Sequence, residues 1–587
     1  MRRMRDPQQI RLFDPFQGVL SPMARKRIAH GWQGLVRTVV LKTLPVATLA
    51  EQFTLGNGCP TKELYSMAGL AHFSMTGLAD FFDWNALEAA DAYMMRTDVQ
   101  FALNVEPGVS CCYRTVERYQ ALFSENNSAA KVFADVTDML VSLLELDVSQ
   151  QRLDSTHVYS HMATFGRVKL MAITLKRCLT QIKRHAIAEY QSLPKDLQAR
   201  YTPAEGKLFA DAKDAEARTR SRLQVAQDML VVIEKFADHS DIKTRPSYTT
   251  LVSVFYQQCE VVGEDRVVVV KTKTGGDVIQ NPSDLDASYD GHKGQGYQIQ
   301  LSETCSPEND VQLILGALPE TASAADGEAV KPMLEELQSR GVLPEVILAD
   351  TAYGGDDNVQ FAASLEVELI APVPGRAPQL EPNQLTVDDF AHNEVTGSVD
   401  ACPASQTPLR VTYDAETEMT CVEMPAASCE SCPLRHLCPI VKLKDGTFQL
   451  EFTDKQARLA ARRAEERTPV FREHYSMRSG IESTNSGLKN RLGLGWLSVR
   501  GQTAVSRKLL HKVTGWNVLR AASSETIRAM VGAMIAKLYG AEWSGLSGQV
   551  FAVVSRDRDR QWSSFRQSRP LQRPAPSKFR NNLNTAS

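Results

Sequence analysis

Four polar residues in the segment 474–492 (HYSMRSGIESTNSGLKNRL) have side chains that handle phosphate groups and metal ions. With Glu482 as the origin of a helical wheel and about 100° per residue, Tyr475 lies at roughly +20°, Arg478 at roughly −40° and Lys489 at roughly −20°. All four therefore share one helix face. An adjoining apolar stripe predicts that the helix docks on a core: Met477, Ile481, Leu488 and Leu492. The alternative is a solvated face on which Arg478 and Glu482 form a pair of about 0.3–0.5 kcal/mol.

Asp350 is an upstream carboxylate that could complement Glu482. It ends the apolar run EVILAD and precedes a Gly-Gly turn. This context predicts a position at the carboxyl end of a buried strand, where α/β sheets place their sites. Turn formation or helix capping suits Asp356 and Asp357 better than it suits Asp350.

A cluster of cysteines lies between Asp350 and Glu482, and its spacing suggests a metal site. Cys429-x2-Cys432 is a metal-knuckle spacing, and Cys438 and Cys402 would complete a closed tetrahedral Zn²⁺ site. Cys421 lies in a strand-like run and is interpreted as a core thiol, and His436 is a second-choice ligand. The alternatives are reduced thiols without metal, or disulfides, which the cytosol disfavours.

The elements that must position these residues change in character along the chain. Residues 1 to about 145 have apolar residues at helical spacing, and a further helical stretch runs from about 168 to 236. From 266 onward β-branched content rises, and strands alternate with helices, which predicts an α/β sheet. The expected strands are RVVVVKTKT, GYQIQLSETC, VQLILGALPE, EVILAD and VELIAPVP.

Length and composition fit a soluble protein of several units. The 587 residues are 43% hydrophobic and 23% charged, and 11 are cysteine. We find no apolar run of 18 residues and no signal peptide, so we expect a cytosolic protein without a membrane partner. The net charge of −3 hides a basic stretch at 455–508 and a tail, 555–587, with eight Lys or Arg against two Asp. Such a tail fits a local DNA contact or a solvated end equally well.

The arrangement Tyr475-x2-Arg478-x3-Glu482-x6-Lys489 resembles the signature of bacterial insertion-sequence transposases of the DDE type. In that family the glutamate is the third catalytic carboxylate, and the Tyr, Arg and Lys contact the DNA backbone. The resemblance continues through RLGLGWLSVRGQTAVSRKLLHKVTGWNVLRAA, with its Asn517-x2-Arg520 pair. The segment from about 59 to 123, which includes SCCYRTVERY, is similar to the family's helical N-terminal domain, which binds DNA ends or supports dimerisation.

The resemblance also implies where the other two carboxylates lie. The family has an RNase H-like sheet with one Asp on its first strand and another after its fourth. LDSTHV resembles the first-strand motif and indicates Asp154, whereas Asp147, in LELDVSQ, matches less well. Asp350 takes the second position. In SDLDASYDGHKGQGYQIQ, which resembles the segment leading into the second strand, Asp284, Asp286 and Lys293 could approach the site, but we assign them turn and surface roles.

These observations predict an RNase H-like α/β core with an all-α N-terminal domain and two insertions. The helical N-terminal domain, for DNA binding or dimerisation, is expected at 1–145. The catalytic domain follows at 146–535, with a helical insertion at about 162–258 and a Cys-rich, zinc-binding insertion at about 390–445. A basic, partly disordered tail would occupy 540–587.

The implied function is a DNA transposase that cuts transposon ends and transfers the freed 3′-hydroxyl to target DNA. Asp154, Asp350 and Glu482 would be the catalytic residues and hold Mg²⁺ or Mn²⁺, with two ions expected, because hard cations prefer carboxylate oxygens. Tyr475, Arg478 and Lys489 would bind DNA. The partners would be double-stranded DNA, as terminal inverted repeats and target, and a second copy of the chain on paired ends, in the bacterial cytoplasm at the nucleoid. An inactive DNA-binding regulator derived from a transposase, and an RNase H-like nuclease, are the alternatives.

Overall fold

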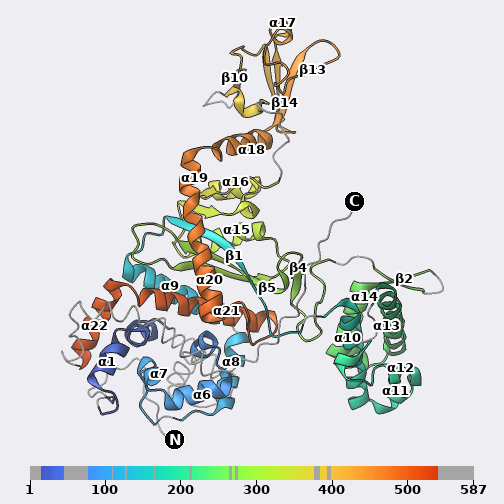
Figure 1. The fold of residues 1–587 in the computed structure, drawn as a ribbon, viewed down its shortest axis with the longest axis vertical. Coiled ribbons are helices and arrows are strands. Elements are labelled where there is room, and N and C mark those ends of the chain that lie inside the picture. The colour runs from blue at the N-terminus through green and yellow to red at the C-terminus, as the bar shows by residue number, and fades with distance from the viewer. Residues whose placement is uncertain are drawn as a thin grey trace.

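The computed structural model describes residues 15–16, 18–44, 77–108, 110–125, 128–163, 165–209, 214–263, 267–271, 275–375, 384–392 and 398–539. The molecule is elongated (Figure 1): a sheet flanked by helices lies in the middle, helices from both ends of the chain lie below it, a small β unit lies above, and a helical unit extends to one side. The predicted tail at 540–587 and residues 59–76 of the family-like N-terminal segment lie outside the described residues. None of the described helices is both long and apolar enough to cross a membrane.

The central sheet is mixed and has the spatial order β6-β5-β1-β7-β8, with the short β4 beside β6 at the same edge of β5. β5 is antiparallel to both β1 and β6, whereas β1, β7 and β8 are parallel to one another. The predicted α/β sheet is therefore confirmed as a mixed sheet. Its strands are β1 (Gln150–Val158), β4 (Ser288–Asp290), β5 (Gly294–Thr304), β6 (Ile314–Thr321), β7 (Val346–Ala349) and β8 (Glu368–Ile370), and α15 (Val330–Ser339) and α16 (Asp356–Ser364) lie between the last three.

Strand β5, which lies between β6 and β1, is buried along almost its whole length, although many of its side chains are polar. Gln300, Ser302 and Glu303 are fully buried. Buried polar groups are costly unless they are hydrogen-bonded, so each must find a partner within the fold. Ser302 donates to Gln151 of β1 at 2.7 Å, and the amide of Gln300 donates to Asp326 at 3.0 Å. This polar interior is a first indication that the sheet carries a site.

The N-terminal helices share a hydrophobic core with the sheet and with the last helices. Phe101, Leu153, Ile347 and Val531 all belong to one buried cluster. The predicted boundary near residue 145 therefore falls inside a common core. The helices are α1 (Pro22–Ala29), α2 (Trp32–Leu35), α3 (Leu41–Thr43), α6 (Ala86–Met95), α7 (Thr97–Ala102), α8 (Tyr113–Glu125) and α9 (Ser128–Leu144), with a π-helical turn at Val36–Val40.

The helical insertion between β1 and β4 has its own hydrophobic core and projects from the sheet (Figure 1). It contains α10 (Arg167–His185), α11 (Ile187–Gln191), α12 (Lys195–Arg200), α13 (Ala215–Phe236) and α14 (Pro246–Gln258). A two-stranded ribbon follows, β2 (Cys259–Val262) with β3 (Val267–Val270). The strand expected at RVVVVKTKT is thus present, but it pairs within this ribbon and not with the main sheet.

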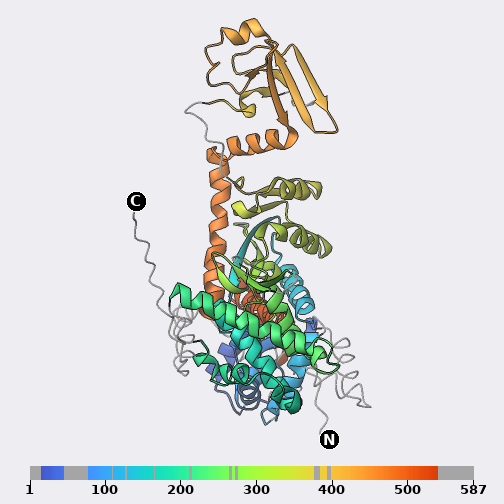
Figure 2. The same ribbon diagram turned by 90° about the vertical axis from the view of Figure 1, so that its right-hand side faces the viewer.

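The Cys-rich insertion is a small β unit at the far end of the molecule (Figure 2). Its four-stranded sheet has the order β11-β12-β14-β13, and β10 pairs with β9. Alternating residues of β12 and β14, such as Val422 and Leu450, fill its core. The elements are β9 (Ala391–His392), β10 (Val399–Ala401), β11 (Arg410–Asp414), β12 (Met419–Met424), α17 (Ala426–Glu430), β13 (Val441–Lys442), β14 (Phe448–Thr453) and the connecting helix α18 (Asp454–Glu465).

The helix predicted over 474–492 is present, but it is interrupted. α19 (Pro469–Ser476) passes through a 3-10 turn at Met477–Ser479 into α20 (Gly480–Leu492), and the three form one rod beside the sheet (Figure 2). Three of the four residues of the predicted apolar stripe, Ile481, Leu488 and Leu492, are buried, and Met477, in the 3-10 turn, is half-buried. The chain then continues through α21 (Gln502–Ala521) and α22 (Glu525–Tyr539).

Candidate active site

Asp154 and Asp350 lie side by side on neighbouring parallel strands. In the register of β1 and β7, Leu153 is opposite Ala349, so the residues that follow them are neighbours. Asp154 is half-way along β1, and its side chain is 17% exposed. Asp350 comes directly after β7, as the sequence predicts. The negative charge of Asp350 contributes to a raised pKa of Asp154, which places the two carboxyl groups within electrostatic reach.

Helix α20 brings Glu482 to the same place. Asn485, one turn after Glu482, donates its side-chain amide to Asp154 Oδ2 at 3.1 Å. The guanidinium of Arg478 lies 3.8 Å from Asp154 Oδ2 and 3.4 Å from Glu482 Oε1. One cationic group therefore spans the two carboxylates. The Glu482 side chain is 67% exposed, so this side of the site is open to solvent.

A buried ion pair fixes the position of α20 on the sheet. Arg152 of β1 donates from Nε to Glu303 Oε2 at 2.8 Å, and Glu303 is fully buried in β5. The same arginine donates to the carbonyl of Met477 at 3.1 Å, and Glu303 accepts from Thr484 at 2.7 Å. Gly480 is required between these contacts, because a Cβ there would lie 1.8 Å from Arg152 Nη1. The register that this network sets places Glu482 and Asn485 over Asp154.

A second polar group lies beside the carboxylates. Lys293 Nζ donates to Ser155 Oγ at 2.9 Å and forms an ion pair with Asp326 Oδ2 at 3.1 Å. Asp326 begins a 3-10 turn and also raises the pKa of Asp154. Lys293 lies in the turn between β4 and β5, as expected, and its side chain also reaches the carboxylate group. The other two residues of that segment do have structural roles: Asp284 accepts from Tyr297, and Asp286 caps α21 at Gln502.

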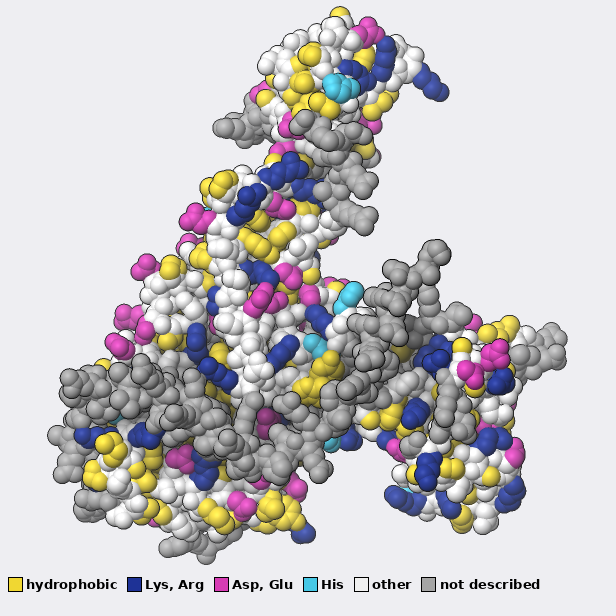
Figure 3. Space-filling view, in the orientation of Figure 1, with side chains coloured by type: hydrophobic (Ala, Val, Ile, Leu, Met, Phe, Trp, Pro, Cys, Tyr) yellow, Lys and Arg dark blue, Asp and Glu magenta, His cyan; other side chains and the backbone are white. Residues whose placement is uncertain are grey.

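The surroundings of Asp154 disfavour its negative charge. Burial raises the pKa of Asp154 to about 6; Arg478 opposes this effect, and Asp350 and Asp326 add to it. Lys489, two turns beyond Glu482, has a pKa lowered by partial desolvation although its side chain reaches the surface. Acidic and basic side chains are mixed over the middle of the face shown in Figure 3. A carboxyl group whose pKa is raised by burial beside other carboxylates, as that of Asp154 is, is typical of a functional site.

Residues 401–522 match the family model for the transposase DDE domain. The matched segment contains Glu482, Tyr475, Arg478 and Lys489, together with the four cysteines of the predicted zinc set, but neither aspartate. The match supports a DNA transposase as the general class of the protein.

Two other comparisons add nothing to the match with the transposase DDE domain. Among solved structures, the cryo-EM synaptic complex of piggyBac transposase with hairpin DNA is 10% identical and covers 70% of this chain and 78% of its own, with a TM-score of 0.20. A TM-score this low carries no argument. No curated protein matches the chain.

Within the segment matched to the transposase DDE domain, Tyr475 lies beside Arg478 and within electrostatic reach of Asp350 and Asp154. It precedes the 3-10 turn, whose tighter winding breaks the even 100° spacing of the helical wheel. Its ring stacks on Phe471 with centroids 5.6 Å apart, and Arg478 lies 5.9 Å from its centroid. Tyr475 therefore supports Arg478 from the side.

The contacts of three aspartates bear on the roles expected for them. Asp350 caps a short 3-10 helix, because its Oδ1 accepts from the backbone of Ala352 at 2.8 Å, and a capping role was not expected for it. Asp356 is buried and pairs with Arg458 at 2.8 Å. Asp147 lies in the turn before β1, where hydrogen bonds from Ser306 and Ser149 lower its pKa. It takes no part in the carboxylate group.

Asn485, Arg152 and Glu303 are the residues of the site that sequence reasoning missed. Asn485 falls at about −60° on the wheel centred on Glu482, next to Arg478, so its position was open to prediction. Arg152 and Glu303 are recognisable only once β1 and β5 are known to pair, because 151 residues separate them.

The four cysteines of the predicted zinc set lie near one another in the Cys-rich unit. Burial raises the pKa of Cys429, and the neighbouring thiols of Cys438, Cys402 and Cys432 raise it further. Cys421 lies on β12 and accepts from Gln449, apart from this set. Within the described ranges, however, no three His, Cys, Asp or Glu side chains are arranged to hold a metal ion as they stand. This statement covers the cysteines and the three carboxylates alike.

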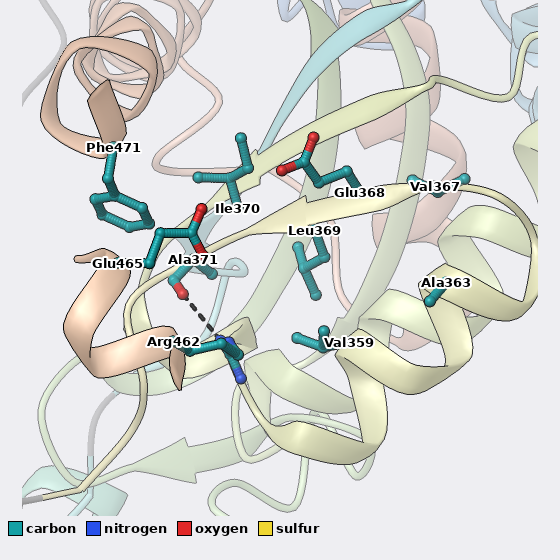
Figure 4. A pocket seen from close by; sticks show the side chains of 10 residues that line it. All are labelled: Val359, Ala363, Val367, Glu368, Leu369, Ile370, Ala371, Arg462, Glu465 and Phe471. Atoms are coloured by element: carbon teal, nitrogen blue, oxygen red, sulfur yellow. Dashed lines mark hydrogen bonds between the residues drawn. The ribbon is translucent and has the colours of Figure 1, made fainter. Parts of the chain in front are cut away.

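A pocket of about 350 Å³ lies elsewhere, at the edge strand β8 (Figure 4). α16 and β8 form one wall, and α18 and Phe471 form the other. Arg462 donates to the carbonyl of Ala371 at 3.0 Å across its floor. None of the three candidate catalytic carboxylates lines this pocket. It lies where α18 packs against the edge of the sheet, and it is separate from the site.

Proposed function

We propose that the protein is a DNA transposase that cleaves at transposon ends and transfers the 3′-hydroxyl to target DNA, with Asp154, Asp350 and Glu482 as its catalytic carboxylates. The observation that carries the proposal is the approach of the three groups from β1, the end of β7 and α20. Glu482 lies inside the segment matched to the transposase DDE domain. The mixed sheet, with only its second strand antiparallel in the order 3-2-1-4-5, supports an RNase H-like core.

The site chemistry suits Mg²⁺ or Mn²⁺. The three carboxylates offer hard oxygen donors, and Arg478 bridges two of them at 3.8 and 3.4 Å, so a positive charge already fits between them. When bound, a pair of such ions would activate the attacking oxygen and stabilise the leaving one. Arg478 and Lys489 would hold the phosphates of the DNA, one as a planar fork and the other as a point charge. Tyr475 would position Arg478.

The test is cleavage of a plasmid that carries the gene with its flanking DNA, in Mg²⁺ or Mn²⁺. We expect nicking at terminal inverted repeats by the wild-type protein, and its loss in Asp350→Asn and in Glu482→Gln. Glu473→Gln, an exposed acid on α19, is the matched control and should cleave normally. Unchanged cleavage by both site variants would show that the assignment is wrong.

The same assay separates the alternatives. DNA binding without cleavage in either metal would favour an inactive regulator. Cleavage without joining of a supplied 3′ end would favour a nuclease. Light scattering with paired ends would show whether two copies act together, as we propose for a cytoplasmic enzyme at the nucleoid.

We also propose a structural Zn²⁺ held by Cys402, Cys429, Cys432 and Cys438. The mutual proximity of four thiols supports this, although their present arrangement is not a closed tetrahedral cage. His436 is exposed and remains the weaker ligand candidate. Elemental analysis of protein purified without chelator should give about one zinc per chain. A value near zero would contradict the proposal, and Cys421→Ser is the control that should keep the zinc.

A further inference from the structure

Trp496 is the most exposed aromatic side chain among the described residues, with 69% of its surface accessible. Single exposed apolar residues are common and by themselves need no explanation. Trp496 differs because it is held rigidly. Its ring stacks on Tyr159 with centroids 4.3 Å apart and planes 17° apart, and His157 packs edge-on against Tyr159 at 4.6 Å.

Backbone hydrogen bonds attach the loop that carries Trp496 to the end of β1. Tyr159 donates its amide to the carbonyl of Gly495 at 2.9 Å, and Leu497 donates to the carbonyl of Tyr159 at 2.8 Å. Gly493, in a left-handed conformation with φ 66°, ends α20 and turns the chain toward this strand. The indole is therefore presented by two elements of the catalytic core, β1 and α20, rather than by a mobile loop.

Cationic side chains border the indole on the side of the carboxylates. The loop packs on Lys489, because a Cβ at Gly495 would lie 3.6 Å from Cγ of that lysine. The Tyr159 hydroxyl donates to the carbonyl of Lys293 at 3.0 Å. Besides burial, which has the largest effect, the charges of Lys489 and Lys293 lower the pKa of His157. Lys293 Nζ also donates to Ser155, the neighbour of Asp154, and the charge of Asp154 acts on Lys489, so both ammonium groups lie near the carboxylates as well as near the rings.

The distances suit a nucleic-acid strand that passes over the site. Tyr159 follows β1 directly and is five residues beyond Asp154, which corresponds to about 16 Å of extended chain. A duplex advances about 3.4 Å per nucleotide in each strand. A base on Trp496 would then lie within about five nucleotides of a phosphate at the carboxylates, and nearer in an extended strand.

We infer that Trp496 and Tyr159 form a stacking platform for an unpaired nucleobase near the bond to be cut, with Lys489 and Lys293 holding the adjoining phosphates. An exposed indole offers every base a π-face, and lysines beside it attract the backbone. This inference rests on the proposed function, since it takes DNA as the substrate, and it names the form of DNA that the site prefers. Neither the signature residues nor the match to the transposase DDE domain assigns a role to Trp496.

The experiment compares two fluorescein-labelled probes, a 12-nucleotide mixed-sequence single strand and the matching blunt duplex, by anisotropy in EDTA with the full-length protein. We expect Trp496→Ala to weaken single-strand binding at least about fivefold, the low end for one base–aromatic stack, and duplex binding less than twofold. Trp496→Phe, which keeps an aromatic face, should recover most of the affinity. Tyr256→Ala, an exposed aromatic of the helical insertion, is the control without effect.

Equal affinities of wild type and Trp496→Ala for the single strand would overturn the inference, and so would equal weakening on both probes. Unchanged DNA affinity with a lower oligomer mass in light scattering would assign the ring to a protein contact instead. Because the assay needs no metal and no cleavage, its result is separate from the test of catalysis. If Glu482→Gln lost cleavage while Trp496→Ala bound both probes as the wild type does, the proposed function would stand and only the stacking platform would be rejected.

Discussion

Asp154 carries a charge that its surroundings disfavour. Burial raises its pKa to about 6 from an ordinary value of 3.8. A raised folded-state pKa means that the folded protein binds the proton more tightly than the unfolded chain, so Asp154 favours folding below about pH 4 and that contribution is lost as the pH rises through 6. Above pH 6 the ionised group costs stability, as expected for a site shaped for a cation and not for its own stability.

Asp154→Asn should therefore stabilise the metal-free protein at pH 8. In EDTA we expect the free energy of unfolding to rise by on the order of 2 kcal/mol, because the neutral amide escapes the cost of ionisation. The gain should vanish near pH 4, where wild-type Asp154 is protonated. Denaturant melts at both pH values measure it. Asp147→Asn is the control and should change stability in the opposite direction, because the pKa of Asp147 is lowered. A less stable Asp154→Asn protein at pH 8 would contradict this reasoning.

At the scale of single residues, the sequence was informative where periodicity and strand ends determine position. The wheel placed Arg478 with Glu482, and the strand EVILAD placed Asp350 at its carboxyl end. The wheel also placed Tyr475 beside Arg478, although the 3-10 turn between α19 and α20 makes its even spacing approximate there. Lys293 lies in the expected turn, but its reach to Ser155 depends on the β4–β5 hairpin, a pairing that local sequence does not reveal.

At the scale of elements, the position of α20 depends on how tightly it approaches β1. A glycine inside a helix, such as Gly480, normally lowers helix stability by about 1 kcal/mol relative to alanine. Here the glycine admits Arg152, whose Nη1 would lie 1.8 Å from an added Cβ. The arginine has little room to move, because Glu303 and the Met477 carbonyl hold it.

We expect Gly480→Ala to destabilise the protein by about 2 kcal/mol, as overpacking of a core does. In a background with Arg152→Met and Glu303→Leu, which removes both buried charges together, the same change should be neutral or stabilising. Urea unfolding of the four proteins gives the coupling energy directly. An equal cost of the alanine in both backgrounds would show that Arg152 is not what Gly480 accommodates.

The elements themselves were largely predictable, but their partners were not. Alternation of strands and helices after residue 266 indicated the sheet, yet Val267–Val270 pairs with β2 in the insertion. β-branched residues favour a strand without specifying its neighbour. Similarly, Asn517 was noted only as part of a pair with Arg520. In the structure the Asn517 side chain is buried. It accepts a hydrogen bond from the backbone N–H of Ile314, at the start of β6, and donates one to the carbonyl of the same residue, so this position needs a side chain that can both donate and accept.

At the scale of the whole molecule, buried charges join the N-terminal helices to the catalytic core. Asp80 is buried and accepts from Arg507 Nε at 2.9 Å and from His511 Nδ1 at 2.7 Å, both on α21. Three residues on, Asp83 pairs with the fully buried Lys512 at 3.0 Å, and burial lowers the pKa of this lysine to about 8. Composition gave no sign of this connection, because each charge taken alone resembles a surface residue.

Removing the charge of Asp80 should therefore weaken the whole described core in one transition rather than release the N-terminal helices alone. Burial tends to raise its pKa, but Arg507 and His511 outweigh that effect, so the net pKa lies well below the ordinary value. We expect Asp80→Asn to cost about 3–5 kcal/mol at pH 7, because the buried charge of Arg507 loses the carboxylate that balances it.

A lowered folded-state pKa gives stability that is present above about pH 4 and is lost as the pH falls below it, by about 1.4 kcal/mol per unit. The difference between wild type and Asp80→Asn should shrink accordingly between pH 4 and pH 3. Asp135→Asn, which breaks only an exposed pair with Lys131, should change stability by less than about 0.5 kcal/mol. Hydrogen exchange of Asp80→Asn gives the contrary outcome a clear form. If α21 stayed as protected as in the wild type while α6 and α7 exchanged freely, the two parts would unfold independently.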